Sequence, residues 1–74
     1  MKRENNKEWI TYSLALYTCS KGYEQMGEYV KAYEHVEKAF EITKELVGTN
    51  TPLAQKYSQF KTKLSLFPEV KSLL

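Results

Sequence analysis

The chain is 74 residues long, which suffices for one small domain and leaves little room for a catalytic cleft. Hydrophobic residues make up 42% and charged residues 27% of the chain, as in ordinary globular proteins, and no apolar run approaches the roughly 20 residues of a membrane span. The formal net charge of +2 is too small to predict nucleic-acid binding. Residues 1–6 lack the apolar core of a signal peptide, so we expect a cytoplasmic protein without membrane insertion.

The first predicted helix covers residues 6–26, with Asn5 or Asn6 as its N-cap. Apolar residues recur along it at alternating spacings of three and four, which is typical of a buried helix face: Trp9, Tyr12, Leu16, Cys19, Tyr23 and Met26. This stripe places Cys19, the only cysteine, in the core. Gly22 interrupts the helix at a cost of about 1 kcal/mol relative to alanine, which predicts a packing reason for it.

A second apolar set lies beside that stripe: Ile10, Leu14 and Tyr17. A helix with one neighbour would not need it, so either the third helix or another protein covers this set. The other five tyrosines fall on stripes assigned to the core, and Tyr17 does not. Because tyrosine on an exposed apolar patch is typical of a contact surface, these three residues are predicted to bind a partner.

The second predicted helix covers residues 28–47 and follows a turn at Gly27, where glycine permits a tight chain reversal. Its apolar positions have helical spacing and lie opposite a charged side: Tyr29, Ala32, Tyr33, Val36, Ala39, Phe40, Thr43 and Leu46 or Val47. Ala32 and Ala39 are small enough to let two helices approach closely. The first two helices are therefore predicted to form a helical hairpin.

The third predicted helix covers residues 52–66. Gly48 suits a left-handed residue at the end of the preceding helix, and Pro52 follows Thr51, a candidate N-cap. The apolar positions of this helix form a narrow stripe: Leu53, Tyr57, Phe60, Leu64 and Phe67. Pro68 should end it, and residues 69–74 can add a short turn.

The third segment is basic. Either its lysines only solvate the outer helix face, or they attract an acidic peptide. Under the second interpretation, Lys56 and Lys63 add positive charge to the predicted partner-binding surface, which Lys21 extends along the first helix. The sequence thus predicts an all-α fold of one domain, residues 1–74: a three-helix bundle made of one helical hairpin and a capping helix.

Residues 13–46 resemble one tetratricopeptide repeat of ~34 residues. The turn and second helix match that family residue by residue: Gly27, Glu28, Tyr29, Ala32, Val36, Ala39 and Phe40. Ser20 takes the place of the small residue in the first helix, and the continuation through Gly48 and Pro52 looks like the long repeats of kinesin light chains. Ser58 and Lys61 stand where a further repeat would have large apolar residues, so the third helix is interpreted as a cap.

The resemblance implies an adaptor or scaffold that binds a peptide or helix of a partner protein in a groove beside the first helix. Leu14, Tyr17, Lys21 and Glu24 take the groove positions, and they do not reproduce the clamp by which some family members hold C-terminal carboxylates. An extended acidic or aromatic peptide, or a helix, fits these residues better.

Two alternatives stay open. The Gly-x-Tyr-x-x-Ala sequence at residues 27–32 and the chain after Pro68 are similar to microtubule-interacting and trafficking domains, which bind amphipathic helices. In that family the third helix continues where Pro68 interrupts this one. The other alternative is a structural subunit that forms a homo-oligomer through the first-helix surface, because single repeats rarely suffice for stability.

Residue types suited to catalysis are scarce: the chain has one His, one Cys and no Asp. The helix neighbours of His35 at three and four positions are Lys31, Ala32, Lys38 and Ala39, none of which is a usual metal ligand. His35 is therefore predicted to be a partly exposed helix residue. We expect no enzyme activity, no cofactor and no metal site.

Overall fold

A computed structural model describes residues 6–74, without the side chain of Asn6. This part of the chain holds four helices and no strand: α1 (Asn6–Gln25), α2 (Tyr29–Val47), α3 (Pro52–Ser65) and α4 (Pro68–Lys71). The all-α prediction is confirmed, and the three long helices begin and end within one residue of their predicted bounds. The predicted N-cap at Asn5 or Asn6 lies outside the described residues and side chains.

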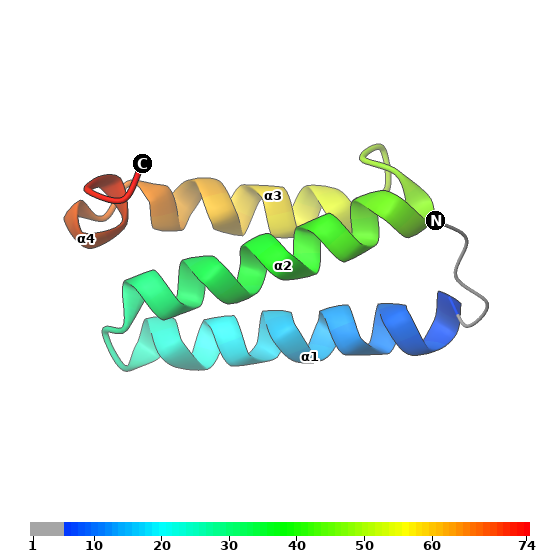
Figure 1. The fold of residues 1–74 in the computed structure, drawn as a ribbon, viewed down its shortest axis with the longest axis horizontal. Helices are drawn as coiled ribbons and strands as arrows, with labels where there is room; N and C mark the ends of the chain where they lie inside the picture. The colour runs from blue at the N-terminus through cyan, green and yellow to red at the C-terminus, as the bar shows by residue number, and fades with distance from the viewer. Residues whose placement is uncertain (1–5) are drawn as a thin grey trace.

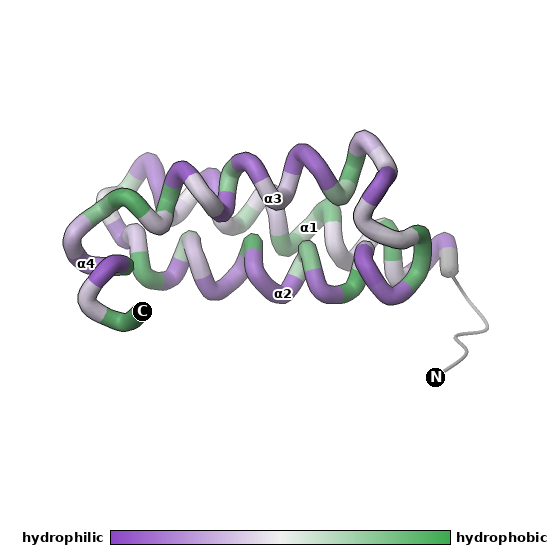
Figure 2. Tube along the Cα trace, turned by 90° about the horizontal axis from the view of Figure 1, so that it is seen from above, coloured by the Kyte–Doolittle hydropathy of each residue, from purple (hydrophilic) through white to green (hydrophobic). Residues whose placement is uncertain are grey.

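The three long helices run along the long axis of a molecule that measures 38 × 20 × 20 Å (Figure 1). α1 and α2 form the predicted hairpin, and α3 returns beside α2. In the view of Figure 1 α2 lies between α1 and α3, and in the view from above α2 lies along the lower edge of the picture, with α1 and α3 overlapping on the other side (Figure 2). The opposite side of the molecule is therefore built by α1 and α3.

The core lies around α2. Hydrophobic and hydrophilic residues alternate along this helix (Figure 2), and Ala32, Val36 and Ala39 are fully buried. α3 adds Tyr57 and Leu64, also fully buried, as its narrow apolar stripe predicted. No helix within residues 6–74 is both long and apolar enough to cross a membrane.

α1 presents a different face to the core from the one predicted. Its fully buried residues are Ser13 and Ser20, whereas Cys19 is exposed and Tyr12 and Met26 are 42% and 68% exposed. The prediction that these three residues lie in the core is wrong. The physical reason is the close approach of α1 to α2, at which only small side chains fit.

Hydrogen bonds of the two buried serines accompany this orientation of α1. Ser20 Oγ donates to the carbonyl oxygen of Ala32 at 2.5 Å, directly across the hairpin. Ser13 Oγ donates to the Ile10 carbonyl at 2.8 Å and lies 3.4 Å from the Tyr57 hydroxyl. The buried serines thus satisfy their polar groups while leaving room for α2 and α3.

The turns follow the predicted chemistry. Gly27 and Gly48 have φ values of 80° and 84°, in the region that favours glycine. Thr51 Oγ1 accepts a hydrogen bond from the Ala54 N–H at 3.3 Å, which confirms the N-cap before Pro52. Gly22 differs from expectation: a Cβ built there would meet no heavy atom of its surroundings within 4 Å, so the fold supplies no packing reason for this glycine.

α4 is the short turn expected after Pro68. The Phe67 ring stacks on Tyr29 at a centroid distance of 3.8 Å and an interplanar angle of 7°. Val70 is fully buried against the core. These contacts therefore hold α4 beside the N-terminal end of α2.

Candidate functional site

The six residues predicted to bind a partner lie on helices α1 and α3, and we call the surface they define the α1/α3 face: Ile10, Leu14, Tyr17, Lys21, Lys56 and Lys63. Leu14 is 41% exposed and Ile10 is half-buried. Leu14 is thus the apolar member of this face that water reaches most easily.

Tyr17 lies where α1 meets α3, at the centre of the α1/α3 face. Its ring centroid lies 5.0 Å from that of Tyr57 and 5.4 Å from that of Phe60, the latter in an edge-on arrangement. The third helix therefore covers part of Tyr17, which is half-buried rather than free. Such aromatic pairs add about 0.5–1.5 kcal/mol beyond their area burial, so Tyr17 also helps to hold α3 on α1.

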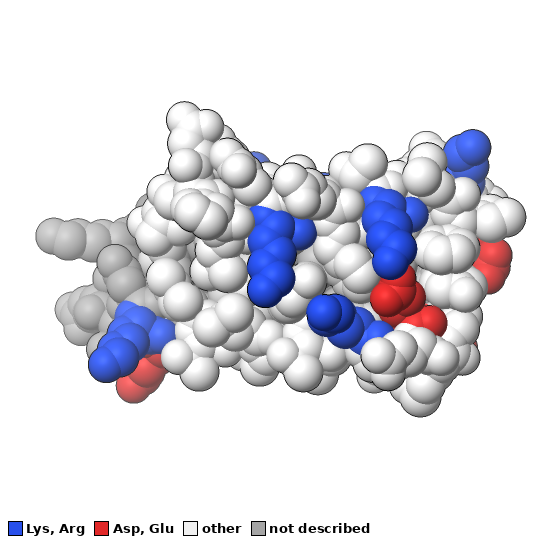
Figure 3. Space-filling model, turned by 180° about the vertical axis from the view of Figure 1, so that it is seen from behind, with Lys and Arg blue, Asp and Glu red and all other residues white. Residues whose placement is uncertain are grey.

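Two lysines converge on the exposed part of Tyr17. Lys21 Nζ lies 5.5 Å from the ring centroid and Lys56 Nζ lies 5.1 Å from it, although they come from different helices. Neither lysine forms an ion pair within residues 6–74. Seen from behind, lysine side chains gather over the middle of this side of the molecule (Figure 3).

Lys63 behaves differently from the prediction. Its Nζ lies 3.1 Å from Glu24 Oε2, in an ion pair that joins α3 to α1, and one lysine in Figure 3 accordingly lies against a carboxylate. The side chain of Glu24 is only 19% exposed, against 61% for Lys63. The positive charge of Lys63 is therefore compensated in part by Glu24 of the same chain, and its contribution to partner binding stays a prediction.

The sequence did not indicate the partner of Lys63. Glu24 follows Tyr17 by seven residues, a spacing that places both on one side of α1. That spacing was the available signal, but the position of Lys63 opposite Glu24 depends on how α3 is rotated.

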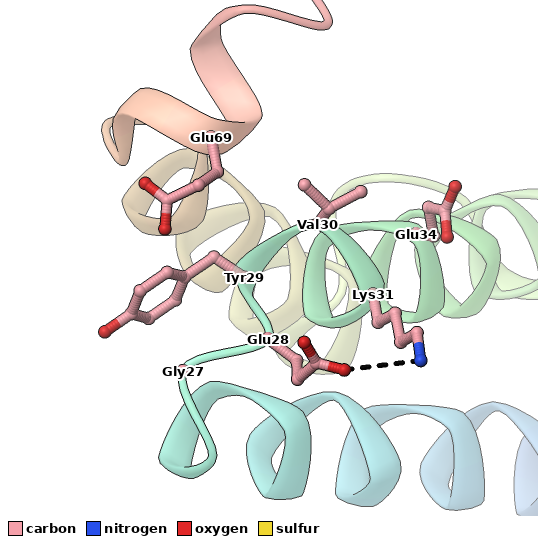
Figure 4. Close-up of a pocket in the computed structure, with 7 residues that line it drawn as sticks. All are labelled: Gly27, Glu28, Tyr29, Val30, Lys31, Glu34 and Glu69. Carbon is pink, nitrogen blue, oxygen red and sulfur yellow. Dashed lines mark ion pairs between the residues drawn. The ribbon is translucent and has the colours of Figure 1, made fainter.

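A hollow of about 310 Å³ lies beside the turn between α1 and α2 (Figure 4), lined by Gly27, Glu28, Tyr29, Val30, Lys31, Glu34 and Glu69. Glu28 Oε2 pairs with Lys31 Nζ at 3.3 Å. Glu69 reaches from α4 toward the Tyr29 ring, while Glu34 points away along α2. The hollow shares no residue with the α1/α3 face, and its carboxylates do not converge on one point.

His35 is half-buried, as expected for a partly exposed helix residue. Its Nδ1 donates to the Lys31 carbonyl oxygen at 2.7 Å, and its ring lies 4.9 Å from that of Tyr23. Over the described residues 6–74, no group of three or more His, Cys, Asp or Glu side chains is placed to hold a metal ion.

No family model, curated protein or solved structure matches this chain. The fold and the α1/α3 face are therefore the basis on which a function is assigned.

Proposed function

We propose that the protein is a non-enzymatic interaction module, an adaptor or scaffold of the cytoplasm built like one tetratricopeptide repeat with a capping helix. It binds a peptide or helix of a partner protein on the α1/α3 face. The observation that carries this proposal is the convergence of Lys21 and Lys56 on one tyrosine ring beside the exposed Leu14.

The composition of this face supports binding. Contact surfaces combine aromatic and apolar anchors with a polar rim, and here Lys21 and Lys56 lie over the ring of Tyr17 on the face that also holds Leu14. Tyr17 is held by Tyr57 and Phe60, so it loses little freedom when a ligand covers it.

The test begins with a displayed library of random linear peptides, selected against the whole chain. The selected peptides are then titrated with two matched variants, Leu14→Gln and Val47→Gln. Both side chains are 41% exposed in the wild type, but Val47 ends α2 and lies outside the α1/α3 face. Leu14→Gln should weaken binding by about ten-fold, as for a contact-surface anchor, and Val47→Gln should leave it unchanged.

Equal effects of the two variants would contradict the proposal, because binding would then not use the α1/α3 face. Thermal unfolding of both variants serves as the control for folding. Failure to select any peptide that depends on Leu14 would also contradict it.

The second candidate function is self-association into a homo-oligomer through the same face. The exposure of Leu14 favours it, since a second copy would cover this leucine as well as a foreign peptide would. A trafficking-domain module is less consistent with the fold, because α3 ends at Ser65, before Pro68.

A further inference from the structure

We infer that the segment bound by the α1/α3 face is acidic and that one of its carboxylates docks between Lys21 and Lys56 above the Tyr17 ring. Glu24 lowers the affinity of the face for this segment, because its own carboxylate forms an ion pair with Lys63. This inference rests on the proposed function and specifies the ligand of the same face.

The geometry of the two free lysines defines the docking point. Both Nζ distances are measured to one ring centroid, so the two ammonium groups are no farther apart than the sum of these distances, about 10.6 Å. Lysine ammonium groups sit on flexible four-carbon stems, so both can turn toward one carboxylate. The tyrosine ring attracts the two cations without neutralising their charge.

The surroundings favour a protein segment over a nucleic acid. A nucleic-acid backbone requires several unpaired basic residues that follow successive phosphates. This face instead has two such lysines, a carboxylate at Glu24 and an exposed leucine at position 14. An acidic side chain next to an apolar one matches this pattern.

Glu24 is a carboxylate of the chain itself that already occupies a lysine on the α1/α3 face. Its side chain is mostly buried, so its position is fixed, and its 3.1 Å contact with Lys63 is of the kind a ligand carboxylate would make. The substitution Glu24→Gln keeps the shape of the side chain and removes its charge. It should therefore release Lys63 for the ligand.

The experiment uses the tightest peptide from the random library, titrated against single variants at low and high salt. Lys21→Gln and Lys56→Gln should each lower its affinity about three- to five-fold, as for exposed ion pairs, and salt should reduce this difference. Glu24→Gln should raise the affinity by a similar factor. Lys38→Gln is the matched control, because Lys38 Nζ also lies over a tyrosine ring, 6.0 Å from that of Tyr12, outside the α1/α3 face.

The selected peptides should be enriched in Asp and Glu beside an apolar residue. Peptides that depend on Leu14 but lack acidic residues and ignore Lys21→Gln and Lys56→Gln would overturn this inference and leave the proposed function intact. The absence of any Leu14-dependent peptide would overturn both. A fall in affinity with Glu24→Gln would show that Glu24 supports the ligand and does not compete with it.

Discussion

Small buried residues determine how α1 lies on α2. Ser13, Ser20, Ala32 and Ala39 are all fully buried, and the hydrogen bond from Ser20 to the Ala32 carbonyl shows how closely the two backbones approach. The large apolar residues of α1 therefore lie at the edges of the contact. Leu16, Tyr17 and Tyr23 pack there against the core.

Substitutions at two adjacent positions can test which face of α1 packs against α2. Ser20→Leu should lower the free energy of unfolding by about 1–3 kcal/mol, because a large side chain overpacks the contact with α2. Cys19→Leu should change it by less than about 0.5 kcal/mol, because Cys19 is exposed. Chemical denaturation of both variants measures the difference, and the opposite order would show that the apolar stripe predicted from the sequence faces the core.

Gly22 offers a stabilising substitution. A Cβ there meets no neighbour within 4 Å, so Gly22→Ala should raise the free energy of unfolding by about 0.5–1 kcal/mol through helix propensity and reduced freedom of the unfolded chain. Gly27→Ala is the contrasting variant: it should destabilise the protein by about 1 kcal/mol, because its φ of 80° strains any side chain. Thermal melts report both changes, and destabilisation by Gly22→Ala would reveal a contact that this structure lacks.

Tyr57 links stability to alkaline pH. Burial raises the pKa of its hydroxyl above the ordinary value of 10.0, and the hydrogen bond with Ser13 opposes this rise in part. The folded state thus keeps a proton that the unfolded chain releases, so the free energy of unfolding should fall as the pH rises through 10. In melts across this range, Tyr57→Phe should show a smaller fall than the wild type, whereas Tyr12→Phe, at an exposed position, should match the wild type.

At the scale of the elements, the stacked pair Tyr29 and Phe67 joins the beginning of α2 to the corner between α3 and α4. α4 has only four residues and would not persist alone. Its place depends on this stack and on the burial of Val70.

Removal of the stack should release α4 while leaving the three long helices folded. Phe67→Ala should speed hydrogen exchange at the amides of Val70 and Lys71, which donate to the Phe67 carbonyl at 3.1 and 2.9 Å, and lower global stability by about 1–3 kcal/mol. Leu66→Ala should have little effect, because Leu66 is mostly exposed. Unchanged exchange in Phe67→Ala would mean that Val70 alone holds α4.

Most of the secondary structure could be predicted from the sequence. Turn residues such as Gly27, Gly48 and Thr51 act locally, so the helix bounds followed from them. The stripes predicted for α2 and α3 contain most of the residues that these helices bury, because large apolar side chains make up most of their buried faces, but Ile42 and Ala54 are buried as well and were not predicted. α1 was misread because its contact face is made of serines, and counting large apolar residues favours the neighbouring face.

The α1/α3 face could be predicted only in part. Leu14, Tyr17 and Lys21 share one side of a single helix, and helical spacing groups them. The meeting of Lys56 with Tyr17, and the pairing of Lys63 with Glu24, depend on the rotation of α3 about its own axis. No local pattern in the sequence encodes that rotation.

At the scale of the whole molecule, the question is whether the α1/α3 face is free to bind a foreign partner. A chain of 74 residues with three long helices buries a small core, so self-association would be an alternative way to cover Leu14. The compact packing of Tyr17 under α3 favours a stable monomer instead.

The most direct test is the molar mass in solution, measured by light scattering on a size-exclusion column over a wide range of protein concentrations. We predict a constant mass of 8.7 kDa, as expected for a monomer whose α1/α3 face stays available. A dimer or larger closed assembly that dissociates in Leu14→Gln and persists in Val47→Gln would contradict this account, because the chain itself would then occupy the face assigned to its partner.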